Sequence, residues 1–194
     1  ELNDKYLIGI DASSMVSGGG RTHLIELLRV AEPNRYNFDK IIVWGSNDTL
    51  KLLDDHPWLI KEHIPTLNKG YFKRLIWQYF NLPKFAYASG CNVLLTPGGG
   101  HSGKFHPVVT MSRNMLPFEW EELIRYGFSL MTLRLILVKF IQLKSYRNAE
   151  GIIYLSKYAK KKIQKITRKI NINTATIPHG INRSFYSKPK QQYN

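Results

Sequence analysis

Residues 6–31 read YLIGIDASSMVSGGGRTHLIELLRVA, and this stretch decides the fold. The run Tyr6–Ile10 is short and apolar, which predicts a buried strand. Asp11–Gly20 is small or polar and ends in three glycines, as is typical of a loop. Apolar side chains then recur at helical spacing over Leu24–Ala31. The stretch therefore predicts a strand, a glycine loop and a helix, the repeating unit of an α/β sheet.

The same alternation continues along the chain. Six further apolar runs predict strands at Ile41–Trp44, Ile60–Ile64, Val93–Leu95, Val108–Met111, Ile152–Leu155 and Ala175–Ile177. Helices are predicted from the Asn47-Asp48 cap to Leu53, at Tyr71–Ala88, at Glu121–Arg147 with a break near Gly127, and at Lys157–Ile170 with Ser156 as its cap. Strands that are apolar throughout and separated by helices or long loops favour a parallel sheet. The fold class is therefore α/β, a parallel sheet of about seven strands with helices on both faces.

Length and composition point to one folded domain. The chain has 194 residues, of which 43% are hydrophobic, and ordinary amounts of glycine and proline exclude disordered and low-complexity classes. The single cysteine, Cys91, opens an apolar run, so we expect a buried thiol and a reducing, cytosolic compartment.

Positive charge is concentrated in the last third of the chain. Residues 134–194 carry 14 basic side chains and one acidic, whereas residues 1–133 carry 14 basic and 13 acidic. Such a one-sided field attracts polyanions: nucleic acid, anionic lipid head groups or an acidic partner. Three cations interrupt the longest apolar stretch, so we expect no membrane-spanning helix.

Several candidate binding residues follow predicted strands, at the edge where open parallel sheets bind ligands. Glycines there let a ligand approach the backbone closely, an arginine binds phosphate or sugar hydroxyls, an aspartate orients hydroxyls or caps its own turn, and a histidine acts as acid, base or donor. These candidates are Asp11, Gly18, Gly19, Gly20, Gly98, Gly99, Gly100, His101, Arg113 and Asn114.

Other site classes do not fit the pattern. A dinucleotide fingerprint needs its glycines directly after the strand, and about seven residues intervene here; the lysine of a phosphate-binding P-loop is also absent. The histidines His23, His101, His106 and His179 lack the spacing of metal ligands, so we expect no metal site.

Taken together, four segments resemble a known family. They are Ser17–Leu24, Val108–Glu119, Ala149–Ser156 and Ile177–Asn182 with Phe185. Their order and spacing are similar to the amino-terminal half of retaining glycosyltransferases of the large group 1 (family 4) type.

The resemblance implies one half of a GT-B enzyme, in which two Rossmann-like halves face a cleft. Residues 1–183 would form the acceptor-side domain and residues 184–194 a linker toward a C-terminal nucleotide-sugar domain. The family holds its donor mainly in that second domain, so the resemblance implies no cofactor bound by this domain and no activity of this chain alone.

The resemblance also assigns residue roles. The family's first glycine loop approaches the donor diphosphate and the acceptor, which carries over to Gly18, Gly19 and Gly20. Many members have a histidine directly after the fifth strand, where this chain has Ser112. That departure leaves Arg113 and His101 as candidates for the catalytic polar group.

The activity implied by the resemblance is transfer of a sugar to a saccharide, most simply a lipid-linked one, in cell-surface polysaccharide or lipopolysaccharide synthesis. The stretch Phe128–Leu143 is apolar around the whole helix, which suits deep burial or contact with lipid. We expect peripheral association with the inner face of the plasma membrane, through a basic surface of Arg134, Lys139, Lys144, Lys157, Lys160, Lys161, Lys162 and Lys165.

Two alternatives remain open at this stage. A basic nucleic-acid-binding α/β module would explain the charge, but the sequence shows no aromatic stacking platform, so we expect no nucleic-acid partner. A sugar-nucleotide enzyme complete in this one domain is the other.

Overall fold

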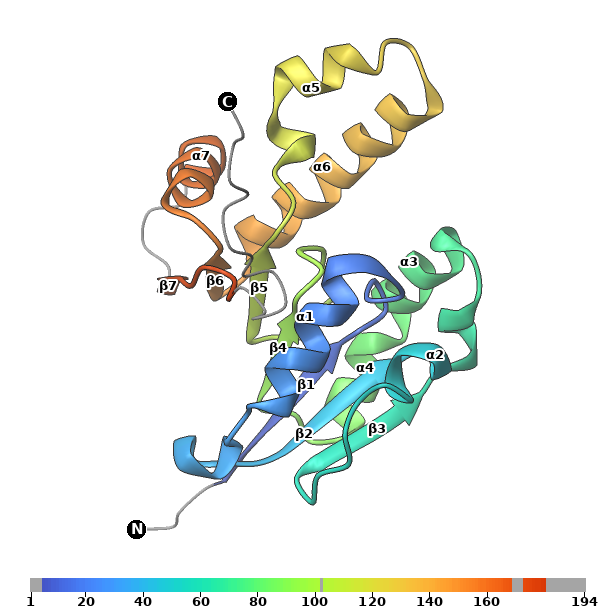
Figure 1. Ribbon diagram of the computed structural model, residues 1–194, viewed down its shortest axis with the longest axis vertical. Helices are drawn as coiled ribbons and strands as arrows, with labels where there is room; N and C mark the ends of the chain where they lie inside the picture. The colour runs from blue at the N-terminus through green and yellow to red at the C-terminus, as the bar shows by residue number, and fades with distance from the viewer. Residues whose placement is uncertain (1–4, 102, 169–172, 181–194) are drawn as a thin grey trace, which may run out of the picture.

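A computed structural model describes residues 5–101, 103–168 and 173–180. Its seven strands form one parallel sheet in the order β3-β2-β1-β4-β5-β6-β7 (Figure 1). The strands are β1 (Tyr6–Asp11), β2 (Phe38–Gly45), β3 (Leu59–His63), β4 (Val93–Thr96), β5 (Val108–Ser112), β6 (Gly151–Tyr154) and β7 (Asn173–Thr176). This confirms the α/β, Rossmann-like architecture expected from the sequence. The predicted boundary at residue 183 and the linker 184–194 lie outside the described residues.

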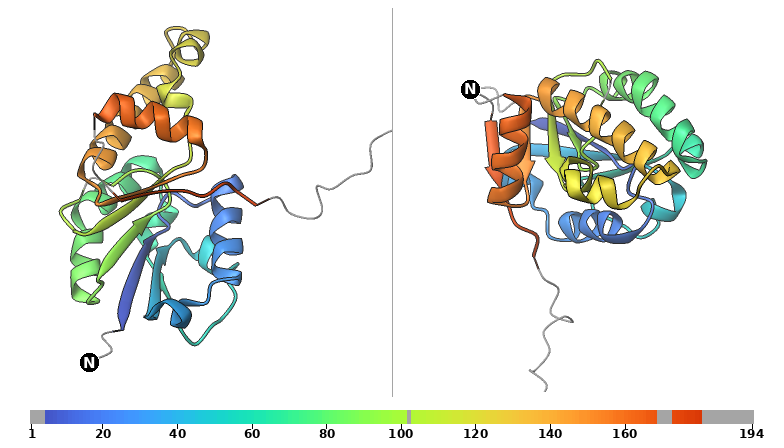
Figure 2. Two further views of the ribbon diagram at one scale, coloured as in Figure 1. Left: turned by 90° about the vertical axis from the view of Figure 1, so that its left-hand side faces the viewer. Right: turned by 90° about the horizontal axis from the view of Figure 1, so that it is seen from above.

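Helices cover both faces of the sheet (Figure 2). The α1 and α2 helices lie on one face, and α3, α4 and α6 lie on the other. The bounds are α1 (Gly18–Arg29), α2 (Asn47–Leu50), α3 (Tyr71–Phe80), α4 (Leu82–Ala88), α5 (Trp120–Arg125), α6 (Leu130–Asn148) and α7 (Lys157–Thr167). Short 3₁₀ turns occupy Pro33–Tyr36, Pro65–Asn68 and Leu116–Phe118.

Alternating side chains of the central strands divide the core between the two faces. Ile10, Ile41 and Val43 pack against Leu24 and Leu28 of α1. On the other face, a cluster joins β2 and β4 to α3 and α4 through Ile42, Trp44, Leu94, Trp77, Leu82 and Ala86. A third cluster packs α6 and α7 against β6. Because both faces of the central strands are buried, runs such as Ile41–Trp44 of β2 are apolar throughout, whereas the edge strands β3 and β7 contain polar residues.

One helix predicted as continuous and one predicted with a break are each divided into two. The predicted helix Tyr71–Ala88 is α3 and α4, because Pro83 lies in the first turn of α4, where its missing N–H and fixed φ favour a new helix start. The predicted helix Glu121–Arg147 breaks where expected: Gly127 has φ +54°, and the Ser129 side chain accepts a hydrogen bond from the Thr132 N–H at 3.3 Å.

Smaller differences concern element ends. Leu155 lies outside β6, and β7 spans Asn173–Thr176, so Ile177 lies outside it. The α7 helix ends at Thr167, followed by Arg168 in the left-handed conformation at φ +54°. Its predicted cap is confirmed, since the Ser156 side chain accepts from the Ala159 N–H at 3.1 Å. The last predicted residue, Ile170, lies outside the described residues.

The all-apolar helix near residues 128–143 is not deeply buried. Phe128 is fully exposed, and Leu130 and Leu133 also face solvent at the end of the α5–α6 hairpin, which projects beyond the sheet (Figure 1); Phe140, further along α6, is exposed as well. Deep burial, one of the two environments expected for this stretch, is therefore wrong. Within the described part of the chain, we find no helix whose length and apolar character suffice to cross a bilayer.

Candidate functional site

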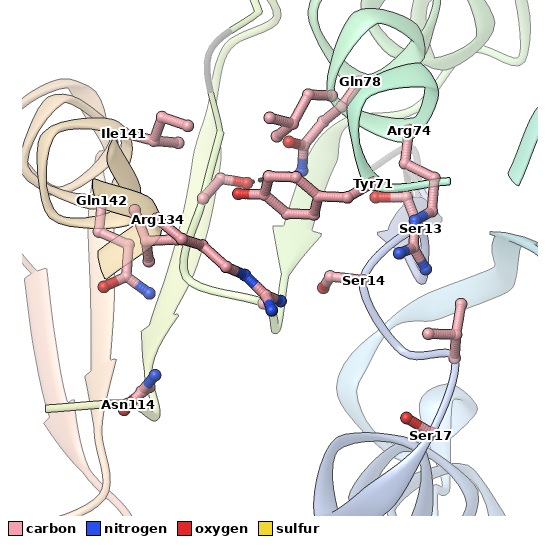
Figure 3. Close-up of a pocket in the computed structure, with 15 residues that line it drawn as sticks. Ser13, Ser14, Ser17, Tyr71, Arg74, Gln78, Asn114, Arg134, Ile141 and Gln142 are labelled. Carbon is pink, nitrogen blue, oxygen red and sulfur yellow. Dashed lines mark hydrogen bonds between the residues drawn. The ribbon is translucent and has the colours of Figure 1, made fainter. Parts of the chain in front are cut away.

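A pocket of about 350 Å³ opens at the carboxyl edge of the sheet. The order of the strands reverses between β1 and β4, because β1 is followed by β2 on one side and β4 lies on the other. Loops diverge at such a switch point and leave a crevice, where α/β sheets bind ligands. The pocket is lined by the loops after β1, β4 and β5 and walled by α3 and α6 (Figure 3).

A buried hydrogen-bond network supports the pocket. The Asp11 carboxylate accepts from the Ser13 N–H at 2.9 Å and from the side-chain amide of Gln78. The same Gln78 amide donates to the Gly100 carbonyl at 2.7 Å. Gln78 therefore ties the β1 loop, the β4 loop and α3 together. Burial raises the pKa of Asp11, while the bonds from Ser13 and Gln78 oppose that rise.

The second glycine triplet lies partly in the pocket. Gly98 and Gly100 line it, and a Cβ on Gly98 would overlap the Ser14 hydroxyl. Gly99 has φ +76°, and a Cβ there would lie 2.9 Å from the Met111 carbonyl, so glycine is needed for the turn itself.

The first glycine triplet forms the opening turn of α1. The Ser17 side chain does not cap this turn, and the turn contains no acidic residue. The Arg113 guanidinium lies against Gly20, where an added Cβ would be 2.7 Å from Nη2. Arg113 forms no ion pair with a described carboxylate; its Nη1 lies 3.1 Å from the Met15 sulfur. Burial lowers the pKa of Arg113 and so disfavours its uncompensated charge.

Two histidines adjoin this arginine. The rings of His23 and His179 contact edge to face, with centroids 4.5 Å apart. Burial lowers the pKa of both rings, and the positive charge of Arg113 lowers them further. An unpaired guanidinium and the N-terminus of a helix together favour an anion at this place.

Other predicted residues lie outside the pocket. Ser112 is buried in β5, with its hydroxyl 3.7 Å from the Met115 sulfur, whereas Asn114 lines the pocket. His101 is buried beside the pocket without lining it, and neither ring nitrogen has a hydrogen-bond partner among the described residues. Burial lowers the pKa of His101 to about 4, against a smaller opposite effect of the Glu150 carboxylate. A neutral, enclosed ring does not reach a ligand in this pocket.

Sequence reasoning missed the residues that the two helical walls contribute. Tyr71, Arg74 and Gln78 come from α3, and Gln142 comes from α6. Their signal was a polar stripe at helical spacing, residues 71, 74 and 78, beside the apolar stripe of the same helix. Arg134 also lines the pocket, with its guanidinium 5.4 Å from the centre of the Tyr71 ring.

The predicted membrane-surface residues separate into groups. Arg134 belongs to the pocket, the Lys144 ammonium lies 5.8 Å from the centre of the Tyr79 ring, and Lys162 forms an ion pair with Glu119. The remaining cations form no ion pair within the described ranges; they are Lys139, Lys157, Lys160, Lys161 and Lys165. The described residues also contain no group of three or more His, Cys, Asp or Glu side chains positioned to hold a metal ion.

The fold and pocket define an α/β, Rossmann-like domain with a pocket at its switch point. No model of a known protein family matches the chain, and no curated protein sequence matches it either.

Proposed function

We propose that this chain is the acceptor-side domain of a retaining glycosyltransferase of GT-B type. It would bind a saccharide acceptor for a sugar delivered from a nucleotide-sugar donor, in cell-surface polysaccharide or lipopolysaccharide synthesis. The Rossmann-like sheet, the glycosyltransferase-like segments Ser17–Leu24 and Val108–Glu119, and the pocket at the switch point support this proposal. A C-terminal domain of the same protein would hold most of the donor.

The strongest support is an unsatisfied acceptor in the pocket wall. Gln142 lines the pocket and is only 4% exposed, and its side-chain oxygen has no hydrogen-bond partner among the described residues. A buried acceptor without a partner is costly, and a ligand hydroxyl would remove that cost. The hydroxyls of Ser13 and Ser14 and the Gly98 and Gly100 backbone add neutral polar groups. This lining suits a hydroxyl-rich ligand.

The neighbouring anion-favouring cluster suits the donor diphosphate. The backbone N–H groups of Gly18, Gly19 and Gly20 open α1, and Arg113 lies against them. The diphosphate would compensate the unpaired Arg113 charge and lie at the positive end of the helix. Acceptor and donor groups would thus meet at one edge of the sheet.

Transfer assays on the full-length protein test the proposal. A panel of nucleotide sugars is incubated with saccharide acceptors, and sugar transfer is measured by mass spectrometry. Gln142→Leu should lower kcat/KM about tenfold or more, because a buried hydrogen bond to substrate is lost, and should leave the free energy of unfolding equal or higher. Gln164→Leu, at a half-buried position of α7 outside the pocket lining, is the matched control and should keep full activity. Absence of transfer from every donor would exclude the proposed function.

We also propose that the domain lies on an anionic membrane. The cations of α7 without a described ion pair would face the leaflet, each worth up to about 1 kcal/mol and screened by salt. The exposed apolar end of the α5–α6 hairpin would add contacts with the acyl region. Flotation with anionic liposomes tests this proposal. Binding should weaken as the salt concentration rises, and a lack of binding even at low salt would reject the proposal.

A further inference from the structure

A second cavity, of about 510 Å³, opens directly beside the pocket. Both cavities share Tyr71, Arg74 and Arg134, so they are one continuous depression between α3 and α6. Beyond those shared residues the lining of the second cavity is wholly apolar: Phe72, Leu130, Leu133 and Leu137. We call this part the apolar groove. A polar pocket therefore leads directly into an apolar groove.

Two arginines stand where the two parts join. Arg74 of α3 and Arg134 of α6 extend from opposite walls toward the space between them (Figure 3). Both lower the pKa of the Tyr71 hydroxyl, against a larger rise caused by burial, so both charges lie near that hydroxyl. Neither arginine forms an ion pair with a described carboxylate, and no acidic residue lines either cavity. Two uncompensated guanidinium groups at one junction favour an anion, most simply a phosphate.

The apolar groove is exposed to water. Phe72 is 72% exposed, Leu130 86% and Leu133 65%, although apolar side chains gain most when they are covered. Leu130, Leu133 and Leu137 recur every three or four residues along α6, so the groove follows the helix for about 10 Å. Its shape suits an extended hydrocarbon chain rather than a sugar.

We propose that the acceptor is a lipid phosphate, with its sugar hydroxyls in the polar pocket, its phosphate between Arg74 and Arg134, and the first part of its hydrocarbon chain in the apolar groove. The order hydroxyls, anion, hydrocarbon matches the order of chemistry along the depression. That the bound lipid is an acceptor rests on the proposed glycosyltransferase function; the binding itself does not.

Calorimetric titration of the full-length protein with hexyl, octyl and decyl phosphate, each below its micelle concentration, tests the proposal. The association constant should rise about twofold to fourfold per added methylene while the groove fills, because each covered methylene leaves water. Inorganic phosphate should bind more weakly than any of the three, and octyl glucoside, which lacks the anion, should bind more weakly than octyl phosphate.

Variants separate the two halves of the depression. Leu133→Ser should reduce the dependence on chain length, and Arg134→Gln should weaken all three alkyl phosphates about tenfold without changing that dependence. Exposed residues distant from the site provide matched controls, Val30→Ser and Arg35→Gln, which should change neither quantity. Equal affinities for hexyl, octyl and decyl phosphate would overturn the proposal, as would equal effects of Leu133→Ser and Val30→Ser on the chain-length dependence. Either result would favour a protein segment as the occupant of the apolar groove.

The outcomes also separate this inference from the proposed function. Chain-length-dependent binding without sugar transfer from any donor would keep the lipid phosphate site and reject the glycosyltransferase. Transfer to soluble saccharides that alkyl phosphates do not inhibit would keep the glycosyltransferase and reject the lipid acceptor.

Discussion

Replacing Gln78 by leucine tests the network beneath the pocket. The substitution removes one hydrogen bond to the Asp11 carboxylate and one to the Gly100 carbonyl. A bond to a charged group contributes about 1.5–3 kcal/mol and a neutral bond about 0.5–1.5 kcal/mol, so Gln78→Leu should lower the free energy of unfolding by about 2–4.5 kcal/mol when Asp11 is ionised. Urea unfolding followed by tryptophan fluorescence measures this loss, with Gln164→Leu as the control.

The pH dependence of this loss identifies its cause. Burial raises the pKa of Asp11, so the folded protein holds that proton more tightly than the unfolded chain, and stability falls as pH rises from about 4 through the folded pKa. The Gln78 bond opposes the rise, so its removal should raise the pKa of Asp11 further. The cost of Gln78→Leu should therefore be greater at pH 7 than at pH 4.

A double-mutant cycle with Asp11→Asn completes the test. The two side chains are in direct contact, so their effects should not add, and a coupling of about 1–3 kcal/mol is expected. Unfolding of Gln78→Leu at the urea midpoint of the unchanged protein, at both pH values, would refute the network as a support of the pocket. Strict additivity in the cycle would refute the Asp11–Gln78 bond in particular.

Three further predictions concern other parts of the molecule. Gly99→Ala should cost about 1–3 kcal/mol in thermal unfolding because of its positive φ and the nearby Met111 carbonyl, whereas Gly19→Ala, with open space in α1, should gain up to about 1 kcal/mol; the reverse order would contradict both assignments. The pKa of His101 is lowered to about 4 in the folded protein, so the unfolded chain takes up the proton first as pH falls. The free energy of unfolding should therefore decrease by about 3 kcal/mol between pH 6.5 and pH 4. His101→Leu should abolish that part of the pH dependence of the urea midpoint, and an unchanged slope would exclude His101 as its source. Phe128→Ser with Leu130→Ser should reduce the partition onto liposomes about a hundredfold or more, since covering each side chain is worth about 1.5–3 kcal/mol, and Val30→Ser should not; equal flotation of all three proteins would place the membrane contact elsewhere.

The fold was predictable because its strands are buried on both faces. Runs such as Ile41–Trp44 and Val93–Leu95 are apolar at every position, as is typical of strands in a parallel sheet covered on both faces. The ends of helices were less predictable where a proline or glycine could be tolerated or could break the helix. Pro83 begins a new helix, whereas a proline at this place can also kink a continuous one.

The candidate site was predictable only where it follows strands. Gly98, Gly100 and Asn114 line the pocket as their positions after β4 and β5 indicated. The predicted end of the fifth strand, Met111, was one residue too early. Ser112 is the last residue of β5 and is buried, so it does not line the pocket. Gln78 of α3 and Gln142 of α6 are 64 residues apart in the sequence. Nothing local in the sequence shows that these two helices face each other across the sheet edge.

The α6 helix takes part in two distant surfaces at once. It is a single helix of 19 residues, about 28 Å long, whose first turn is exposed at the hairpin end and whose later turns carry Gln142 beside the pocket. The inner turns of α6 are packed against β6 through Leu143 and Tyr146. The opposite wall, α3, is fixed to the sheet by Trp77. Both walls of the depression are therefore anchored in the core, so the packing of the core sets its width.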